Sequence, residues 1–309
     1  MSDKPVIGLA LGSGGARGLA HAGVLAALED AGLQPPVISG SSMGAVVGGL
    51  YAETGDAAAT WRRLSAFARD PEFLETWTHF IARGSGEQEQ LGFVQSFFGT
   101  MVRKLMTFKT LTRPALADEA KLLNPLKHMF TARDFAELKL TFAAVAVDLI
   151  SGRKVEFREG DLIDAIYASS AIPGVFPPVR RNGAFIVDGG VLFRVPIDTC
   201  RDLGADFVIA VDLPAFESSK PEYRTGLEIM MRADTLAKMR LNEFVLETAD
   251  LVISPEVSAY HWADFRRADE CRERGYEATT AALPALREAL DRRRGWRSRL
   301  RRLIGRDAA

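Results

Sequence analysis

Cysteine is scarce in this chain, and long apolar runs are missing. The 309 residues include only two cysteines, Cys200 and Cys271, and neither belongs to a C-x-x-C pair. The spacing excludes a disulfide framework and a zinc signature, and it is typical of a reducing cytoplasm. No apolar run reaches the length that crosses a membrane, and we expect no signal peptide because the N-terminus leads directly into a strand. No ligand spacing demands a metal, so we expect no metal and no cofactor.

Charge is nearly balanced overall but unevenly spread. The net charge is −1, yet residues 287–309 hold nine arginines and only three acids, which makes this segment +6. Trp296, Leu300, Leu303 and Ile304 are interleaved with the arginines, the last three at close to helical spacing. Such a segment can lie as a helix on anionic lipid headgroups, or it can be a solvated tail. We expect no nucleic-acid partner, because no recognisable nucleic-acid-binding fold surrounds the basic run.

The most informative motif is Gly40-Ser41-Ser42-Met43-Gly44, a G-x-S-x-G sequence. It follows a short apolar run at 36–38 and opens a helical segment at 45–50. Strand, G-x-S-x-G and helix in this order are typical of a nucleophile elbow, in which Ser42 stands on a strained turn with its hydroxyl exposed. Small residues are needed at Gly40 and Gly44 because a Cβ there would clash with a neighbouring element. The alternative is a tight turn with Ser42 as a plain helix N-cap.

A second glycine cluster, 12–18, lies between an apolar strand at 6–11 and a helix at 19–28. The dinucleotide-binding pattern G-x-G-x-x-G fails here, and no Walker lysine is present. Glycine-rich loops present bare backbone N–H groups to an anion, so this loop can form an oxyanion hole for Ser42. Two such turns about one βαβ unit apart would lie side by side at the carboxyl edge of a parallel sheet. The alternative is an ordinary strand-to-helix turn.

A third candidate is Asp188, which ends the apolar strand 184–188 and precedes Gly189-Gly190. An acid at a strand end with glycines behind it can approach another loop closely. Asp-Gly is also a common β-turn signature, so this motif alone does not decide between the two interpretations.

Together these motifs resemble the patatin-like phospholipase family. Four segments agree with it in order and rough spacing: 14–18, 40–44, 168–179 and 188–190. The resemblance implies a lipid acyl hydrolase with a Ser42–Asp188 dyad. It implies an oxyanion hole built from Gly14, Gly15, Ala16, Arg17 and Gly18. The chain departs from the family pattern at Ser13, which bears on the oxyanion hole, and at Phe193-Arg194, which puts the shape of the Asp188 loop in doubt.

The order of elements predicts an α/β fold. We expect buried strands at 141–148, 207–212 and 251–253, a half-exposed strand at 154–158, and helices at 161–169, 223–248 and 263–291. The family resemblance implies a three-layer sandwich with a mainly parallel central sheet flanked by helices. We assign 1–286 to the hydrolase domain and 287–309 to a basic tail. A helical insertion is expected at about 56–135, where a helix at 91–106 with one aromatic and methionine face would be a lid, an acyl groove or core packing.

Which residue takes the serine proton is left open by the motifs. Chain order also allows a Ser42–Asp188–His261 triad, because a G-x-S-x-G elbow is usually followed by an acid and then a histidine. The family resemblance assigns no histidine to catalysis, and His21, inside the first helix, is expected to pack or cap locally. Burial is expected to raise the pKa of Asp188 and so improve it as a base. Arg17 is expected to tie the glycine loop to a nearby carboxylate or carbonyl.

The resulting expectation is a serine lipid acyl hydrolase of the phospholipase A or lysophospholipase type. Its partners would be lipid or lysophospholipid esters, with peripheral membrane contact through 91–106 or 287–309. It would act in the cytoplasm, at the inner membrane face where it touches lipid. The alternatives are a Ser-Asp-His esterase using His261, a non-catalytic lipid-binding regulator and an acyltransferase.

Overall fold

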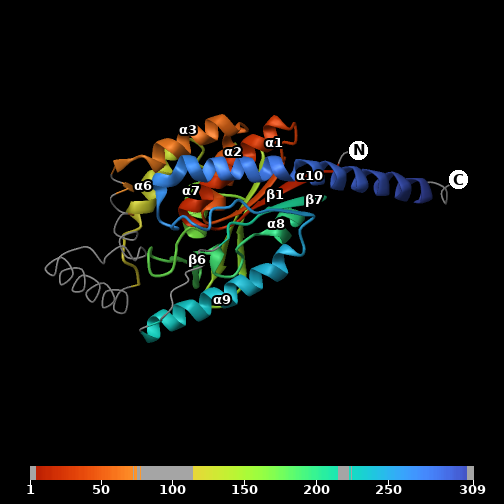
Figure 1. Cartoon of the computed structure of the whole chain (residues 1–309). Coiled ribbons are helices and arrows are strands. Elements are labelled where there is room, and N and C mark those ends of the chain that lie inside the picture. The colour runs from red at the N-terminus through yellow and green to blue at the C-terminus, as the bar shows by residue number, and fades with distance from the viewer. Residues whose placement is uncertain are drawn as a thin grey trace.

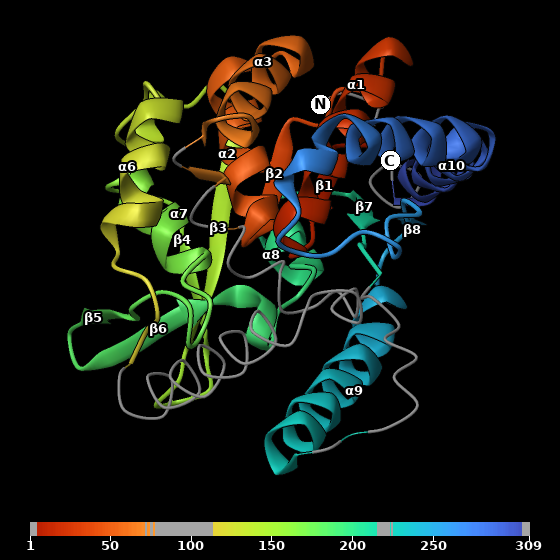
Figure 2. The same cartoon turned by 60° about the vertical axis from the view of Figure 1, so that its left-hand side comes forward.

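The computed structural model describes residues 5–71, 73–74, 77, 114–214, 223 and 225–304. Eight strands form one sheet in the order β5-β6-β3-β2-β1-β7-β8, and β4 pairs with β3 beside this path (Figures 1 and 2). The strands are β1 Ile7–Leu11, β2 Val37–Ser41, β3 Thr141–Asp148, β4 Lys154–Phe157, β5 Val179–Arg181, β6 Ala184–Asp188, β7 Phe207–Val211 and β8 Leu251–Ile253. Strands β3, β2, β1, β7 and β8 are parallel, whereas β4, β5 and β6 pair antiparallel. The fold is therefore α/β with a mainly parallel sheet, as the sequence predicted.

Helices cover both faces of the sheet, in three layers (Figure 1). They are α1 Ala20–Asp30, α2 Met43–Thr54, α3 Ala57–Ala68, α6 Ala120–Met129, α7 Leu162–Ser169, α8 Ile197–Asp202, α9 Gly226–Leu246 and α10 Ala268–Ile304. Short 3-10 turns lie at Gly15–Leu19, Phe135–Glu137, Gly189–Val191 and Phe265–Arg267.

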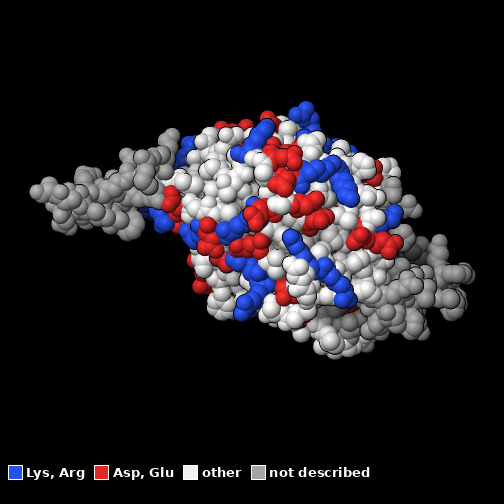
Figure 3. Space-filling model, turned by 180° about the vertical axis from the view of Figure 1, so that it is seen from behind, with Lys and Arg blue, Asp and Glu red and all other residues white. Residues whose placement is uncertain are grey.

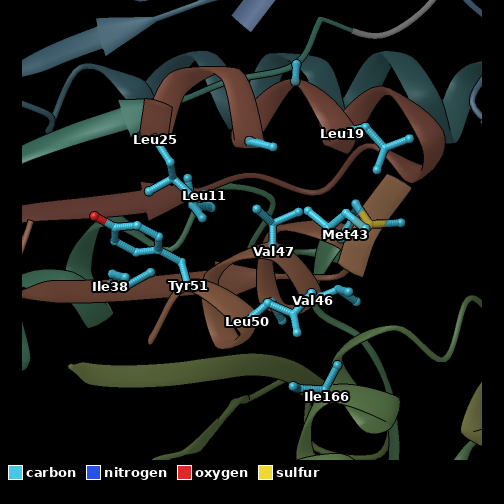
Figure 4. Packing of buried hydrophobic residues seen from close by; sticks show 14 of the residues in the cluster. Leu11, Leu19, Leu25, Ile38, Met43, Val46, Val47, Leu50, Tyr51 and Ile166 are labelled. Atoms are coloured by element: carbon cyan, nitrogen blue, oxygen red, sulfur yellow. The ribbon is translucent and has the colours of Figure 1, made fainter. Parts of the chain in front are cut away.

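Alternation along the strands explains the layers. In β1, Leu9 and Leu11 belong to the main core with α1 and α2, whereas Ala10 belongs to a second core with Ile197 and Cys200 of α8. Successive side chains point to opposite faces of a strand, so an apolar strand needs a helix on each side. Figure 4 shows the main core, where Leu11 of β1 and Ile38 of β2 pack near Leu25 of α1 and Tyr51 of α2.

Capping side chains fix where several helices begin. Asp56 accepts a hydrogen bond from the Ala59 N–H at the start of α3, and Asp161 accepts one from the Asp164 N–H at the start of α7. Thr225 and Glu228 form a reciprocal capping box at the start of α9. Each cap satisfies backbone donors that have no partner within the helix.

Several expectations need correction or extension. Helix α10 continues to Ile304 instead of ending near 291, so 287–304 is helical and continuous with the preceding helix. Strand β5 and helix α8 were not expected from the sequence, because three and six residues are too short for a periodic signal. The expected helix at 91–106 lies outside the described residues, and the domain limits at 286 and 287 stay predictions.

Two further observations concern surfaces and membranes. Among the described residues, no helix is both long enough and apolar enough to span a bilayer. On the face seen in Figure 3, basic and acidic side chains are interspersed, so charge of one sign does not dominate that face.

Helices α1 and α10 approach each other at two glycines. A methyl group at Gly23 of α1 would lie 1.8 Å from the Arg272 carbonyl oxygen, and one at Gly275 of α10 would lie 1.9 Å from the Ala20 carbonyl oxygen. Both distances are far below van der Waals contact, so α10 can lie against α1 only because neither position carries a side chain.

We therefore predict that Gly23→Ala lowers the free energy of unfolding by about 1–3 kcal/mol, because overpacking separates α1 from α10. Intrinsic helix propensity alone would favour alanine by about 1 kcal/mol. Urea unfolding measures the change. The matched control is Gly226→Ala at the start of α9, where a methyl group meets no atom within 4 Å. Equal effects of the two substitutions would contradict the close approach.

Candidate functional site

Ser42 lies on a strained turn between β2 and α2. Its φ is 56° and its ψ is −124°, a conformation that residues with a side chain rarely adopt. Flanking glycines allow the turn, since a methyl group at Gly40 would lie 2.3 Å from the Gly44 carbonyl oxygen and one at Gly44 would lie 2.2 Å from that of Leu11. Met43 begins α2, so Ser42 stands directly before a helix N-terminus. This is the local geometry of a nucleophile elbow.

The Ser42 hydroxyl donates a hydrogen bond of 2.6 Å to Oδ2 of Asp188. The two residues are 146 positions apart, and both side chains are 5% exposed. The sheet brings them together through β3, because Val145 of β3 pairs with Ser41 and the adjacent Ala146 pairs with Asp188. The structure therefore places the two sequence-predicted residues in direct contact.

The Asp188 carboxylate is held and desolvated by its own loop. Its Oδ1 accepts a hydrogen bond of 2.7 Å from the Gly190 N–H, and the Asp188 N–H donates to the Ala171 carbonyl oxygen. Burial raises the pKa of Asp188 to about 6, although the hydrogen bonds from Ser42 and Gly190 act in the opposite direction. Such a carboxyl is a better proton acceptor than an exposed aspartate and still ionises at neutral pH.

Glycines allow the Asp188 loop to reach the serine. A methyl group at Gly189 would lie 2.3 Å from the Val145 carbonyl oxygen, and one at Gly190 would lie 2.5 Å from Ser13 Oγ. The Asp188 loop thus contacts the glycine loop at Ser13, one of the two places where the chain departs from the family pattern. The second departure is at Phe193-Arg194, where Arg194 donates to the carbonyl oxygen of Leu213 and forms an ion pair with Asp212.

Ser169 is a site residue that the sequence analysis did not single out. Its hydroxyl accepts a 3.0 Å hydrogen bond from the Ser42 N–H and donates one of 2.6 Å to the Val145 carbonyl oxygen. The side chain therefore fixes the backbone of the elbow. The sequence contains one signal for Ser169, which lies within 168–179, one of the four segments that resemble the family.

Two of the backbone N–H groups in the glycine loop are already paired. Ser13 N–H donates to the Arg194 carbonyl oxygen at 2.9 Å, and Ala16 N–H donates to the Trp262 carbonyl oxygen at 2.6 Å. Within the described part of the chain, the N–H groups of Gly14 and Gly15 have no protein acceptor. Gly15 has a φ of 58° and lines the same cavity as Ser42. Gly14 and Gly15 are thus the loop residues best able to serve an incoming oxyanion.

Arg17 and Gly18 support this loop from within the 3-10 turn. The Arg17 guanidinium donates to the carbonyl oxygens of Pro214, at 2.7 Å, and of Gly14, at 3.4 Å, and burial lowers its pKa to about 10. A methyl group at Gly18 would lie 2.2 Å from Met43 Cγ. Arg17 therefore braces the loop, and Gly18 lets the loop pack against the elbow.

Neither of two candidate histidines contacts the dyad. His21 is fully buried and its Nε2 donates to the Gly12 carbonyl oxygen at 2.8 Å, while burial lowers its pKa to about 4. His21 is neutral at physiological pH and holds the glycine loop. His261 Nδ1 accepts a 3.3 Å hydrogen bond from the Ala263 N–H, and its ring lies beside Trp262. Asp188 uses its two carboxylate oxygens for Ser42 and Gly190.

An apolar cavity of about 30 Å³ adjoins Ser42. Its walls include Met43 and Val46 of α2, Leu122 and Leu126 of α6, and five aromatic residues: Phe67, Phe73, Trp77, Phe176 and Phe265. Phe73 and Phe265 meet edge to face with 4.8 Å between their ring centroids, and Trp77 and Phe176 do so with 5.9 Å. Such a wall suits a hydrocarbon chain next to the nucleophile.

In the described segments, no group of three or more His, Cys, Asp or Glu residues could hold a metal ion.

Comparison with known proteins shows what this chain is similar to. A family model described as "Patatin-like phospholipase" matches residues 9–201. An uncharacterized NTE family protein of Mycobacterium tuberculosis is 35% identical over 217 residues, which cover 70% of this chain and 51% of that protein. A lysophospholipase of Aspergillus fumigatus, nte1, is 27% identical over 70% of this chain and 12% of its own length. The chain thus spans about half the length of its M. tuberculosis relative.

Among solved structures, the crystal structure of VipD from Legionella pneumophila is similar to this chain. The match covers 94% of this chain and 67% of the VipD chain. The TM-score is 0.46 and the sequence identity is 14%.

The raised pKa of Asp188 predicts how the free energy of unfolding depends on pH. The folded state binds its proton up to pH about 6 and the unfolded chain only up to about 3.8, so stability falls as pH rises between these values. Two pKa units correspond to about 3 kcal/mol. We expect Asp188→Asn to be more stable than the wild type at pH 7, by up to about 3 kcal/mol, because an amide can bond both Gly190 N–H and Ser42 Oγ without carrying charge.

Urea unfolding at pH 7 and at pH 4 measures this gain, which should shrink at the lower pH because the wild-type carboxyl is then neutral in the folded state. An Asp188→Asn variant less stable than the wild type at pH 7 would show that the buried charge is not costly. Asp134→Asn, in which a half-buried helix cap is changed in the same way, is the matched control.

Proposed function

The chain belongs to the patatin-like phospholipase family, and on this premise we propose that it is a serine hydrolase of lipid esters, of the phospholipase A or lysophospholipase type. The observation that carries the proposal is the 2.6 Å hydrogen bond from Ser42 Oγ to the buried Asp188 carboxylate. A hydroxyl on a strained turn, paired with a base, is the arrangement that nucleophilic catalysis requires. The A. fumigatus relative, which is named a lysophospholipase, supports the same substrate class.

In the first step, Ser42 Oγ attacks the carbonyl carbon of the ester and its proton passes to Asp188 Oδ2. Burial prepares the carboxylate for this role, because its pKa of about 6 leaves it ionised at pH 7 and yet basic enough to take a proton in the transition state. The hydrogen bond from Gly190 holds the other oxygen, so Oδ2 stays directed at the serine.

The tetrahedral oxyanion is stabilised by the N–H groups of Gly14 and Gly15. We restrict the proposed donors to these two, since the Ala16 N–H is engaged with Trp262 and Arg17 and Gly18 support the loop. One donor in such a site contributes about 3–4 kcal/mol to stabilisation of the transition state. The start of α2, directly after Ser42, adds the positive end of a helix dipole.

The tetrahedral intermediate then collapses: Asp188 gives its proton to the leaving alcohol, the ester C–O bond breaks and the acyl group stays on Ser42. Water then attacks the acyl-enzyme with Asp188 as base, which releases a fatty acid and restores the serine. The aromatic wall beside Ser42 shields the acyl chain from water. An acyltransferase would use the same acyl-enzyme, with an alcohol in place of water.

Geometry favours the dyad over the triad. Ser42 Oγ donates directly to Asp188 Oδ2, and His261 Nδ1 accepts a hydrogen bond within its own loop. A lipid-binding regulator without catalysis would not need the strain at Ser42 or the raised pKa of Asp188. For membrane contact we propose the basic 287–304 end of α10 on anionic headgroups, together with the segment 91–106, with the enzyme acting at the cytoplasmic face.

We predict that Ser42→Ala and Asp188→Asn each lower kcat/KM for a medium-chain p-nitrophenyl ester by more than about a thousandfold. The two losses should be comparable, because the residues act as one unit. His261→Ala, the control for the triad, should retain activity within about threefold. A spectrophotometric assay measures turnover, and thermal melting verifies the fold of each variant.

Labelling by a fluorophosphonate probe separates an enzyme from a lipid binder. The wild type and His261→Ala should be labelled, and Ser42→Ala should not. An unlabelled wild type would contradict the proposed function, and loss of activity in a folded His261→Ala variant would assign the proton transfer to the histidine.

The pKa of Asp188 predicts the pH dependence of the reaction. Only the ionised carboxylate accepts a proton, so kcat/KM should be constant above pH 7 and fall about tenfold per pH unit well below pH 6. The profile is measured with an ester whose hydrolysis is followed by pH-stat. A midpoint near 4 would indicate a solvated carboxyl, and a flat profile would remove Asp188 from the mechanism.

A further inference from the structure

Two cavities of very different size lie on either side of one aromatic pair. The cavity at Ser42 has a volume of about 30 Å³, roughly that of a single water molecule in the liquid. The second cavity has a volume of about 740 Å³, lies between α3 and α6, and has walls that include Arg63, Ala66, Pro125, Met129 and Thr131. Only the larger one lies in the range of sites that bury a whole ligand.

Phe67 and Phe73 line both cavities. Their ring centroids are 3.8 Å apart with 43° between the planes, so the two rings are in contact where the cavities adjoin. Helix α6 completes it, because Leu122 and Leu126 face the small cavity and Pro125 and Met129 face the large one. The route from Ser42 into the large cavity is therefore blocked mainly by two side chains.

The chemistry of the large cavity favours a hydrocarbon chain as its occupant. Three of its polar side chains are already engaged within the protein. Arg63 and Thr131 both bond Glu53, and Arg63 also donates to the Met129 carbonyl oxygen. The Asp70 carboxylate accepts the Phe73 N–H. Of the other described wall residues, six are apolar, Ala66, Phe67, Phe73, Ala120, Pro125 and Met129, and the polar ones, Lys121, Asn124 and His128, are exposed to solvent.

A long acyl chain bonded to Ser42 does not fit in 30 Å³. The same chain would fit if its distal carbons entered the space behind Phe67 and Phe73. Phe67 is free to move further than Phe73, because Phe67 is partly exposed near the end of α3, whereas Phe73 is buried against Phe265.

We propose that the Phe67–Phe73 pair is a partition that sets the acyl chain length: acyl groups too short to reach the pair react while it stays in place, and long ones react only when the pair moves aside and admits them to the large cavity. The inference rests on the proposed function and specifies the substrate class of the same site. Under this proposal, helices α3 and α6 select the acyl group. Both helices lie within the insertion expected at 56–135.

The test compares kcat/KM for p-nitrophenyl esters of four and twelve acyl carbons. In Phe67→Ala the ratio of the twelve-carbon to the four-carbon ester should rise about tenfold or more over that of the wild type, because removing one ring joins the cavities. Phe73→Leu, a milder change in a buried position, should move the ratio in the same direction. Phe135→Leu is the matched control for Phe73→Leu, since Phe135 is also buried, stacks on Phe142 and lines neither cavity.

An unchanged ratio in folded Phe67→Ala, or an equal rise in Phe135→Leu, would overturn the partition while leaving the proposed function intact. A wild type that hydrolyses neither ester in a Ser42-dependent manner would overturn both. Thermal melting of each variant establishes that it is folded, and if Phe73→Leu does not fold, Phe67→Ala alone decides the result.

Discussion

The whole arrangement depends on one contact, between the Ser42 hydroxyl and the buried Asp188 carboxylate. A carboxylate loses hydration when buried, and here its main compensation is two hydrogen bonds, from the serine and from the Gly190 N–H. The contact forms only if the elbow at Ser42, the Asp188 loop and the glycine loop approach one another closely. Glycines at 40, 44, 189 and 190 meet that condition, since a methyl group at any of them would lie within 2.5 Å of a neighbouring atom.

Strain and desolvation at this point must be supported elsewhere in the fold. Ser42 has an unfavourable φ, and Asp188 has a raised pKa, so both reduce the stability of the native state. Rigid neighbours hold them in place: Ser169 fixes the elbow backbone, while Arg17 and His21 fix the glycine loop. Apolar cores on both faces of the sheet supply the compensating stability. An exposed dyad would lose both its alignment and its basicity.

Local sequence predicted much of the fold, and the failures have physical reasons. Buried runs such as 141–148 and 207–211 match strands because long β-branched and apolar segments need two covered faces. Strand β5 was missed because three residues carry no periodicity. The length of α10 was underestimated because its arginine-rich end has few apolar residues to mark a buried face. Ser169 was missed because a serine reveals its partner only when the fold places one beside it.

By itself, the sequence determined the strand-turn-helix context of Ser42, the glycines around it and an acid at the end of 184–188, because these depend on short-range sterics and composition. The resemblance to a known family joined them into one hypothesis. Only the tertiary structure decided that Ser42 and Asp188 are in contact, that His261 bonds elsewhere and that Phe67 and Phe73 separate two cavities. Strand order and side-chain packing set these distances, and neither follows from the local sequence.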